Sequence, residues 1–364
     1  MDVTDISYQR LHAQRIEGEH CQSAAETVEW MGAIQAQDYN LALWAIGLRT
    51  PGSTKSEVEQ SIFEKKIVRT WIMRHTIHFV SLQDVRWMLE LSSERMIKKY
   101  LNHVEKSTGL TVKQLNQATE ILYLALKKHQ QLTRPEIRIV LENAGIPTGQ
   151  QGLYHILWYA AQSGMVFIGP MKGKQQTFLL IEDWMPKSTP LTQEEALKKL
   201  TIRYITSHGP ATVHDFAWWS GLTISTAKKG MQLAHKEVFK ETRNKKEYWS
   251  SVNTLTASKG DGLNLTFLPS LDEYLIGYKD RIDVISAEAY AKIDPQKNGI
   301  FFPLIESGQV AGSWKPKHKA AVINLTIRLV PTVSISNERL KIAAEQYCYF
   351  FEKSLGELTI ETIL

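Results

Sequence analysis

The stretch GPATVHDFAWWSGL, residues 209–222, has the pattern of the second helix of a helix-turn-helix unit. Thr212 suits the N-cap, because its hydroxyl can accept a free amide proton of the first turn, and Asp215 follows in that turn. The elements expected around it complete a winged helix-turn-helix: a helix over 194–207, a helix over 225–235 and a hairpin with a basic turn over 237–250.

The same order of elements occurs once before in the chain. In LTRPEIRIVLENAGI, residues 132–146, Thr133 suits an N-cap, and Pro135 and Glu136 suit the first turn. The neighbouring expected elements are helices over 112–128 and 152–163 and a hairpin within 165–184. Thr133 and Thr212 are 79 positions apart (212 minus 133), so the period is that of a small domain rather than of a solenoid repeat.

The N-terminal region can be interpreted in the same way. Its expected elements are helices over 8–16 and 24–37, a helix capped by Ser53 or Thr54 that ends near 65, and a hairpin IVRTWIMRHTIHFVS over 67–81. The sequence therefore predicts an α+β chain with three tandem winged-helix modules, over residues 1–105, 106–190 and 191–258.

Residues 259–364 have a different character. The runs 263–281, 299–314 and 320–330 are β-rich and separated by turn signals, and one helix is expected near 337–349. We expect a β-barrel-like domain that follows the three modules.

Composition excludes several classes of protein. With 43% apolar and 22% charged residues, the chain is typical of a globular protein. Only Cys21 and Cys348 occur, without a CxxC motif or a Cys/His cluster, so neither a disulfide framework nor a structural zinc is expected. The N-terminus lacks the features of a signal peptide and no apolar run could span a membrane. Nor is there a P-loop, HExxH or GxSxG motif. We expect a cytoplasmic protein without metal or cofactor.

The formal net charge is +5, but the charge is unevenly distributed. Residues 197–260 contain eleven Lys and Arg against four Asp and Glu, a local excess of seven. Such a cluster can neutralise phosphates and release counterions. On charge alone, it equally fits a solvated helix face followed by a basic loop.

The segment Ile34–Asp38 (IQAQD) places two glutamines and a carboxylate among apolar neighbours, at the end of the second predicted helix. Buried amides need hydrogen-bond partners. Gln35 and Gln37 either satisfy backbone groups between helices or bind a molecule that is not part of the protein. Because positions i and i+2 of a helix lie about 200° apart, both side chains converge only if the helix ends near Ala36. Asp38 either caps a helix or supports the pair.

Five blocks of the sequence together resemble a known family: IQAQDYNLALWAIGLR (34–49), VRTWIMRHTIHFV (68–80), GPATVHDFAWWSGL (209–222), FLPSLDEYLIGYKDR (267–281) and GQVAGSWKP (308–316). The resemblance is to winged-helix DNA-binding proteins that include bacterial DNA glycosylases for alkylated and crosslinked DNA. It implies a C-shaped channel for double-stranded DNA, a bacterial protein used at the nucleoid, and a catalytic Gln-x-Gln pair at Gln35 and Gln37.

The chemistry of such a pair limits the substrate. A glutamine is no base near neutral pH, but its amide can accept and donate hydrogen bonds and so direct a water towards C1′ of the sugar. An N7- or N3-alkylated purine is cationic and leaves as a neutral base, so positioning can suffice. We therefore predict a monofunctional glycosylase for cationic alkylpurines, with bulky and crosslinked adducts as candidate substrates. The alternative is a non-catalytic winged-helix DNA-binding protein or regulator. Three unlike modules favour a monomer over a symmetric dimer.

Several residues are candidates for DNA contact or for support of the glutamines. The predicted hairpin contributes Arg69, Trp71, Arg74 and, as a support, His78; the third module contributes Lys228, Lys229, Lys245 and Lys246; the C-terminal part contributes Trp314 and Lys315. Other interpretations remain open, namely that Trp71 is a core residue, that the arginines pair with acids such as Glu64 or Asp84, and that Trp314 closes the barrel. No chemical role follows for Asp272, Tyr274, Tyr278 or Arg281.

Overall fold

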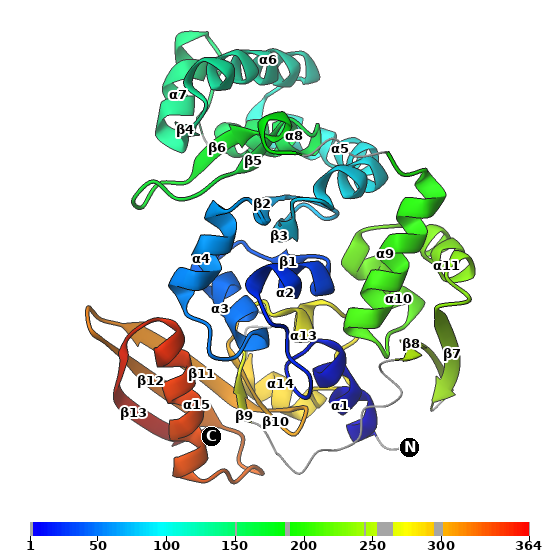
Figure 1. The fold of residues 1–364 in the computed structure, drawn as a ribbon, viewed down its shortest axis with the longest axis vertical. Coiled ribbons are helices and arrows are strands. Elements are labelled where there is room, and N and C mark those ends of the chain that lie inside the picture. Colours follow the sequence, from blue (N-terminus) through cyan, green and yellow to red (C-terminus); the bar gives the residue numbers. More distant parts are fainter. Residues whose placement is uncertain are drawn as a thin grey trace.

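A six-stranded sheet in the centre of the molecule joins the first two predicted modules (Figure 1). The computed structural model describes residues 3–149, 151–185, 190–243, 245–252, 265–294 and 301–363. The strand order is β1-β3-β2-β5-β6-β4, with bounds β1 Ile34–Gln35, β2 Ile67–Trp71, β3 Ile77–Ser81, β4 Leu132–Thr133, β5 Val166–Ile168 and β6 Thr177–Leu180. The two predicted hairpins are confirmed, and they meet where Arg69 pairs with Ile168.

The helices of the N-terminal region are α1 Val3–Ala13, α2 Ala24–Met31, α3 Tyr39–Arg49 and α4 Lys55–Phe63. Thr54 caps α4 and forms a reciprocal capping box with Glu57. The prediction of one helix over 24–37 was wrong beyond Met31. Gly32 ends α2 with φ 77°, a backbone conformation that glycine adopts easily, and the chain continues into β1.

The upper part of Figure 1 is helical. It contains α5 Val85–Thr108, α6 Val112–His129, α7 Arg134–Asn143 and α8 Gly152–Gln162, and the short 3-10 helix η1 Ile181–Asp183 follows β6. The sequence predicted the last three α-helices, and Thr133 caps α7 in a capping box with Glu136. It did not predict α5, which is 24 residues long and packs against α8 and against the later helix α9 Gln193–His208.

The third stretch has the predicted order of elements: α9 Gln193–His208, α10 Val213–Ser220, α11 Ile224–Leu233, β7 Val238–Arg243 and β8 Lys246–Ser251. Thr212 caps α10, accepts the amide proton of Asp215 at 3.1 Å and donates to the Asp215 carboxylate at 2.8 Å. The strands of this hairpin pair with each other and form a separate two-stranded sheet.

The C-terminal part is a curled, five-stranded half-barrel sheet with the order β13-β12-β11-β10-β9. Its elements are β9 Leu265–Phe267, α13 Glu273–Ile276, α14 Ala287–Ile293, β10 Pro303–Glu306, β11 Gln309–His318, β12 Val322–Leu329, α15 Asn337–Phe350 and β13 Ser354–Thr362. The sequence did not predict β13, which runs parallel to β12. The predicted boundary at 258 and the predicted strand positions 263, 264, 299 and 300 lie outside the described residues.

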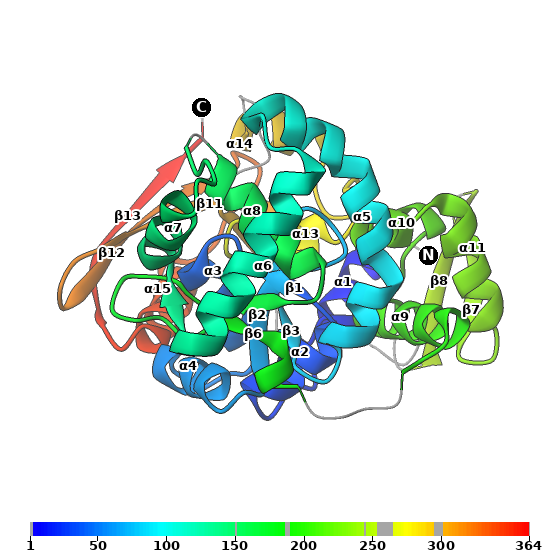
Figure 2. The same ribbon diagram turned by 90° about the horizontal axis from the view of Figure 1, so that it is seen from above.

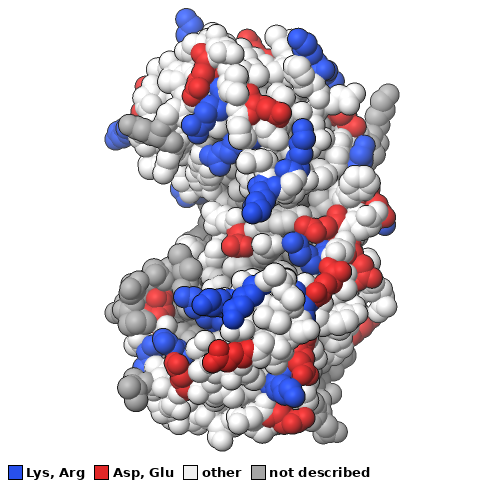
Figure 3. All heavy atoms as spheres, turned by 90° about the vertical axis from the view of Figure 1, so that its left-hand side faces the viewer, with Lys and Arg blue, Asp and Glu red and all other residues white. Residues whose placement is uncertain are grey.

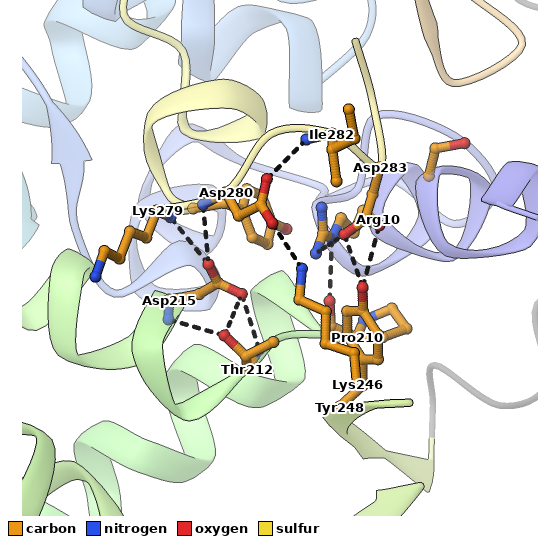
Figure 4. Close-up of polar contacts among 12 residues, drawn as sticks. Arg10, Pro210, Thr212, Asp215, Lys246, Tyr248, Lys279, Asp280, Ile282 and Asp283 are labelled. Atoms are coloured by element: carbon orange, nitrogen blue, oxygen red, sulfur yellow. Dashed lines mark hydrogen bonds and ion pairs between the residues drawn. The ribbon is translucent and has the colours of Figure 1, made fainter. Parts of the chain in front are cut away.

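The half-barrel and the third stretch lie on opposite sides of the molecule in both ribbon views (Figure 1, Figure 2). The segment that follows α13 reaches the third stretch through buried polar contacts (Figure 4). The Asp215 carboxylate accepts the backbone N–H of Lys279 at 2.9 Å. Arg10 of α1 donates to the Pro210 carbonyl and to Asp283, both at 3.0 Å. These contacts fix the C-terminal part against α1 and α10, next to the N-terminal region.

Candidate active site

Strand β1 and the residues after it place Gln35 and Gln37 on the same side of the chain. In extended backbone, positions i and i+2 point to one face, which removes the difficulty that a helix posed. The Ala36 N–H donates to the Ile77 carbonyl at 2.7 Å, so the pairing with β3 continues past Gln35. The Gln35 amide nitrogen Nε2 donates to Gln37 Oε1 at 3.0 Å. Gln35 is half-buried and Gln37 is exposed, so the pair reaches the surface.

Side chains from two other elements hold the backbone of this pair. Arg69 of β2 donates from Nε and Nη2 to the Ala36 carbonyl at 2.8 and 2.6 Å, and from Nη2 to the Gln37 carbonyl at 3.1 Å. Glu273 of α13 accepts the Gln35 backbone N–H at 2.9 Å. The pair is therefore fixed from both sides of the strand.

Glu273 is a buried carboxylate, with 1% of its surface exposed. Its second oxygen accepts the Trp219 indole N–H at 3.1 Å, and His208 Nε2 lies 3.8 Å away, beyond hydrogen-bond distance. Burial raises the pKa of Glu273, but His208 and the positive charge of Arg74 lower it by more, to about 2. Glu273 is therefore an anion at neutral pH, and sequence reasoning gave it no role.

His78 lies directly opposite Gln35 in the β1–β3 pairing and is completely buried. Its Nδ1 is 3.0 Å from the Thr76 carbonyl and its Nε2 is 3.3 Å from Arg74 Nη2. A ring that donates from Nδ1 to the carbonyl and accepts at Nε2 satisfies both contacts. Burial and the charge of Arg74 lower the pKa of His78 to about 3. His78 is therefore neutral near pH 7, and it lies beside Gln35 on the neighbouring strand with its ring bonded within the hairpin.

Asp38 caps helix α3, since its carboxylate accepts the Leu41 N–H at 3.0 Å. The sequence left open whether this residue caps a helix or supports the chemistry, and the geometry shows the cap.

Three residues predicted to contact DNA are buried, so direct contact does not fit them. Arg69, Trp71 and Trp314 each have 2% of their surface exposed. The Trp71 indole donates to the Tyr154 hydroxyl at 3.2 Å, and the Trp314 indole donates to the Leu268 carbonyl at 2.9 Å. Aromatic side chains on the core face of a sheet pack inward and give their N–H to a buried acceptor. The pairing of Arg69 with an acid was also wrong, because its donors reach backbone carbonyls.

Arg74 is half-buried and turns towards His78 and Glu273 rather than to the open surface. Asp84, the other acid considered for the arginines, pairs instead with Lys199 and Arg203 of α9, at 3.0 Å each.

The predicted lysine contacts lie at or near the surface. Lys228, Lys229 and Lys245 are exposed, and Lys229 pairs with Glu194 at 2.7 Å. Lys246 is half-buried and pairs with Asp280 at 2.9 Å.

Lys315 is exposed on β11, where alternate residues face the core or solvent. Lys317 shares its face, and the partner strand β12 presents Thr326 and Asn324 there. Figure 3 shows this side of the molecule, with Lys and Arg side chains on both parts that flank a waist in its outline. The outer face of β11 and β12 is therefore polar, and it carries Lys315 and Lys317.

The four C-terminal residues without an assigned role have structural contacts. Asp272 accepts two hydrogen bonds from Arg49, at 2.9 and 3.0 Å, in a buried ion pair. The Tyr274 hydroxyl is 2.8 Å from the Gly308 carbonyl, and the Tyr278 hydroxyl donates to the His208 carbonyl at 2.6 Å. The Arg281 carbonyl accepts two backbone N–H groups of the following turn. In the sequence, the dense run of acidic and aromatic residues was the available sign of these structural contacts.

Within the residues described, no group of three or more His, Cys, Asp or Glu side chains is arranged to hold a metal ion. No helix in that same part of the chain has both the length and the apolar character needed to cross a bilayer.

Comparison with known proteins identifies the family. Residues 28–350 match the family described as DNA glycosylase AlkZ-like. An interstrand DNA cross-link repair glycosylase of Streptomyces sahachiroi is 24% identical over 327 residues, which cover 84% of this chain and 85% of that protein. The solved structure of the Streptomyces sahachiroi DNA glycosylase AlkZ has a similar fold, with a TM-score of 0.80, 20% identity and 99% of each chain covered. The chain belongs to the AlkZ-like DNA glycosylase family.

Proposed function

We propose that this protein is a monofunctional DNA glycosylase that hydrolyses the N-glycosidic bond of cationic N7- and N3-alkylated purines in duplex DNA. Bulky and crosslinked adducts are included, since a relative is named as an interstrand cross-link repair glycosylase. The observation that carries the proposal is the Gln35–Gln37 pair, which reaches solvent while Arg69 and Glu273 hold its backbone. A cytoplasmic, monomeric protein that acts on the nucleoid is part of the proposal.

In the proposed reaction, the two amides orient a water towards C1′ while the base departs. The transition state has oxocarbenium character. The C1′–N bond breaks and its electron pair neutralises the alkylated purine, while the water oxygen bonds to C1′ and one of its protons passes to solvent. The carboxylates closest to the pair are already engaged, Asp38 by the Leu41 N–H and Glu273 by Gln35 and Trp219. This arrangement positions a water better than it deprotonates one. It therefore suits bases that leave easily.

DNA binding is proposed to use the three helix–hairpin stretches as winged-helix modules, over residues 1–105, 106–190 and 191–258, with the half-barrel over 259–364. The exposed lysines at 228, 229, 245 and 315 are the proposed phosphate contacts, and Lys246 joins them if it exchanges its partner Asp280 for a phosphate.

The test is base excision from duplex DNA that carries N7-methylguanine, followed by alkali cleavage at abasic sites under single-turnover conditions. We expect Gln35→Ala and Gln37→Ala each to lower the excision rate about 100-fold, because the water loses its orientation. Gln60→Ala is the matched control, since Gln60 is exposed on α4 and bonds only to its neighbour Glu64 within the described residues.

Excision at the normal rate by both glutamine variants would contradict the proposed role of the pair. No product from the unaltered protein on several alkyl lesions, together with sequence-specific binding, would favour a non-catalytic DNA-binding regulator instead.

A further inference from the structure

A small cavity separates the glutamine pair from the segment 269–271, which comes from the C-terminal part of the chain. Its volume is about 10 Å³, and its lining residues are Gln35, Gln37, Asp38, Leu41, Ala42, Ala45, Pro269, Ser270 and Leu271. A cavity of roughly 10–15 Å³ is needed to hold one water, and a bound water needs two to four polar partners. The cavity is therefore just large enough for one water, and the glutamines account for only one side of it.

Ser270 belongs to the part of the wall that the segment 269–271 forms. It is 7% exposed, and its hydroxyl has no hydrogen-bond partner among the residues that the structure describes. A buried hydroxyl without a partner costs about 1–3 kcal/mol, so such groups are normally satisfied by protein or by water. The cavity is where a partner for this hydroxyl can bind.

The wall that carries Ser270 is held in place relative to the glutamines. Asp272 forms a two-bond ion pair with Arg49 of α3, and both residues are buried. Glu273 bonds to the Gln35 backbone at 2.9 Å. Between them and Ser270, Leu271 adopts φ 65°, an unfavourable conformation for a residue with a side chain that the surrounding contacts must hold. The position of Ser270 relative to Gln35 is therefore set by the fold rather than by a free loop.

We propose that Ser270 is a third water-binding residue of the active site, whose hydroxyl bonds to the attacking water from the segment 269–271. This inference rests on the proposed glycosylase function. A hydroxyl can accept one hydrogen bond from the water while a glutamine carbonyl accepts the other. Both protons of the water are then engaged, and its lone pairs stay free, so that one of them can point out of the cavity towards the sugar.

The test compares single-turnover excision of N7-methylguanine by the full-length protein and its variants. Ser270→Ala is expected to lower the rate about tenfold, the size expected for one neutral hydrogen bond on the reacting water. The DNA concentration for half-maximal rate and the thermal midpoint should not change, because the hydroxyl lacks a described protein partner. Ser92→Ala, which removes a buried hydroxyl bonded to the Met88 carbonyl in α5, is the control for activity.

A second pair of variants separates the hydroxyl from its volume. Ser270→Thr and Ser270→Val have side chains of nearly the same shape, and only threonine keeps the hydroxyl. We expect the threonine variant to be the faster of the two. If the unaltered protein is active, two results would overturn the role of Ser270 and leave the proposed glycosylase function standing. One is equal rates for the threonine and valine variants, and the other is a normal rate for Ser270→Ala. An unaltered protein inactive on every alkyl lesion would overturn the proposed function and this inference with it.

Discussion

The guanidinium of Arg69, on β2, reaches the residues that follow β1, with its donors directed at the carbonyls of Ala36 and Gln37. An arginine on a predicted wing suggested contact with a DNA phosphate, but the charged guanidinium of Arg69 donates its hydrogen bonds inside the protein. Burial lowers the pKa of Arg69 to about 10, so the side chain stays protonated near neutral pH. Its charge strengthens the hydrogen bonds that shape the candidate site.

Arg69→Met is therefore expected to destabilise the protein by about 2–3 kcal/mol, since hydrogen bonds from a charged donor are lost and buried carbonyls are left unsatisfied. The free energy of unfolding in urea measures this effect. Arg138→Met, at an exposed position of α7, serves as the control and should change stability little. An Arg69→Met protein as stable as the unaltered one would show that these carbonyls find other donors.

His78 predicts a dependence of stability on pH. Its pKa is about 3 in the folded protein, below the ordinary value of 6.5, so the unfolded chain binds a proton that the folded chain does not. Stability from this group is present above pH 6.5 and falls as the pH drops from 6.5 towards 3, by at most about 1.4 kcal/mol per pH unit.

We expect His78→Gln to flatten the plot of unfolding free energy against pH between 4.5 and 6.5. His129→Gln, at the exposed end of α6, should leave the slope unchanged. An unchanged slope for His78→Gln would mean that His78 is not held neutral.

At the scale of elements, the change from α2 to β1 decides the geometry of the glutamines. Gly32 makes this change possible with φ 77°, in a space bounded by Arg203 and Trp219. A helix that continued through Gln37 would have turned the two amides away from each other.

Gly32→Ala is expected to cost about 1–3 kcal/mol, because alanine is strained at this φ and its methyl group would meet Arg203 at 3.0 Å. The excision rate should fall with it, since strand β1 follows directly. Gly149→Ala, where an added methyl group meets nothing within 4 Å, is the control. Thermal unfolding and single-turnover excision measure the two effects. A Gly32→Ala protein that is normal in both would show that the geometry of the glutamine pair does not depend on glycine at position 32.

At the scale of the whole molecule, exposed charge is distributed over parts that are distant in sequence. Lys228 lies on α11 and Lys315 on the outer face of the half-barrel, on opposite sides of the ribbon views (Figure 1, Figure 2). A duplex that contacts both must extend across the molecule.

Lys228→Ala and Lys315→Ala are each expected to reduce the slope of log binding constant against log salt concentration by about 0.9, the contribution of one phosphate contact. Fluorescence anisotropy with undamaged duplex DNA at several salt concentrations measures this slope. Lys127→Ala is the control, because Lys127 on α6 already pairs with Glu182 and Asp183. If both variants have the same slope as the unaltered protein, Lys228 and Lys315 do not contact DNA phosphates.

The sequence by itself determined the hairpins, most helices of the three stretches and the family resemblance, but it missed α5 and β13 and extended α2 into β1. Capping residues such as Thr133 and Thr212 bond within one helical turn, and the alternation of side-chain faces in 67–81 lies within one hairpin. Local sequence patterns are therefore enough to predict these helix starts and this hairpin. The sequence also singled out Gln35 and Gln37 as amides among apolar neighbours, and the family resemblance implied the catalytic role that is proposed for them.

The tertiary structure decided which side chains surround that pair. Glu273 contacts Gln35 across 238 positions of the chain, and Trp71 and Trp314 turn inward because of packing partners distant in sequence. A local pattern shows that a residue is polar or aromatic, but not which face of a sheet is covered. Burial and long-range hydrogen bonds depend on how distant segments pack, so the surroundings of Gln35 and Gln37 became known only from the folded chain.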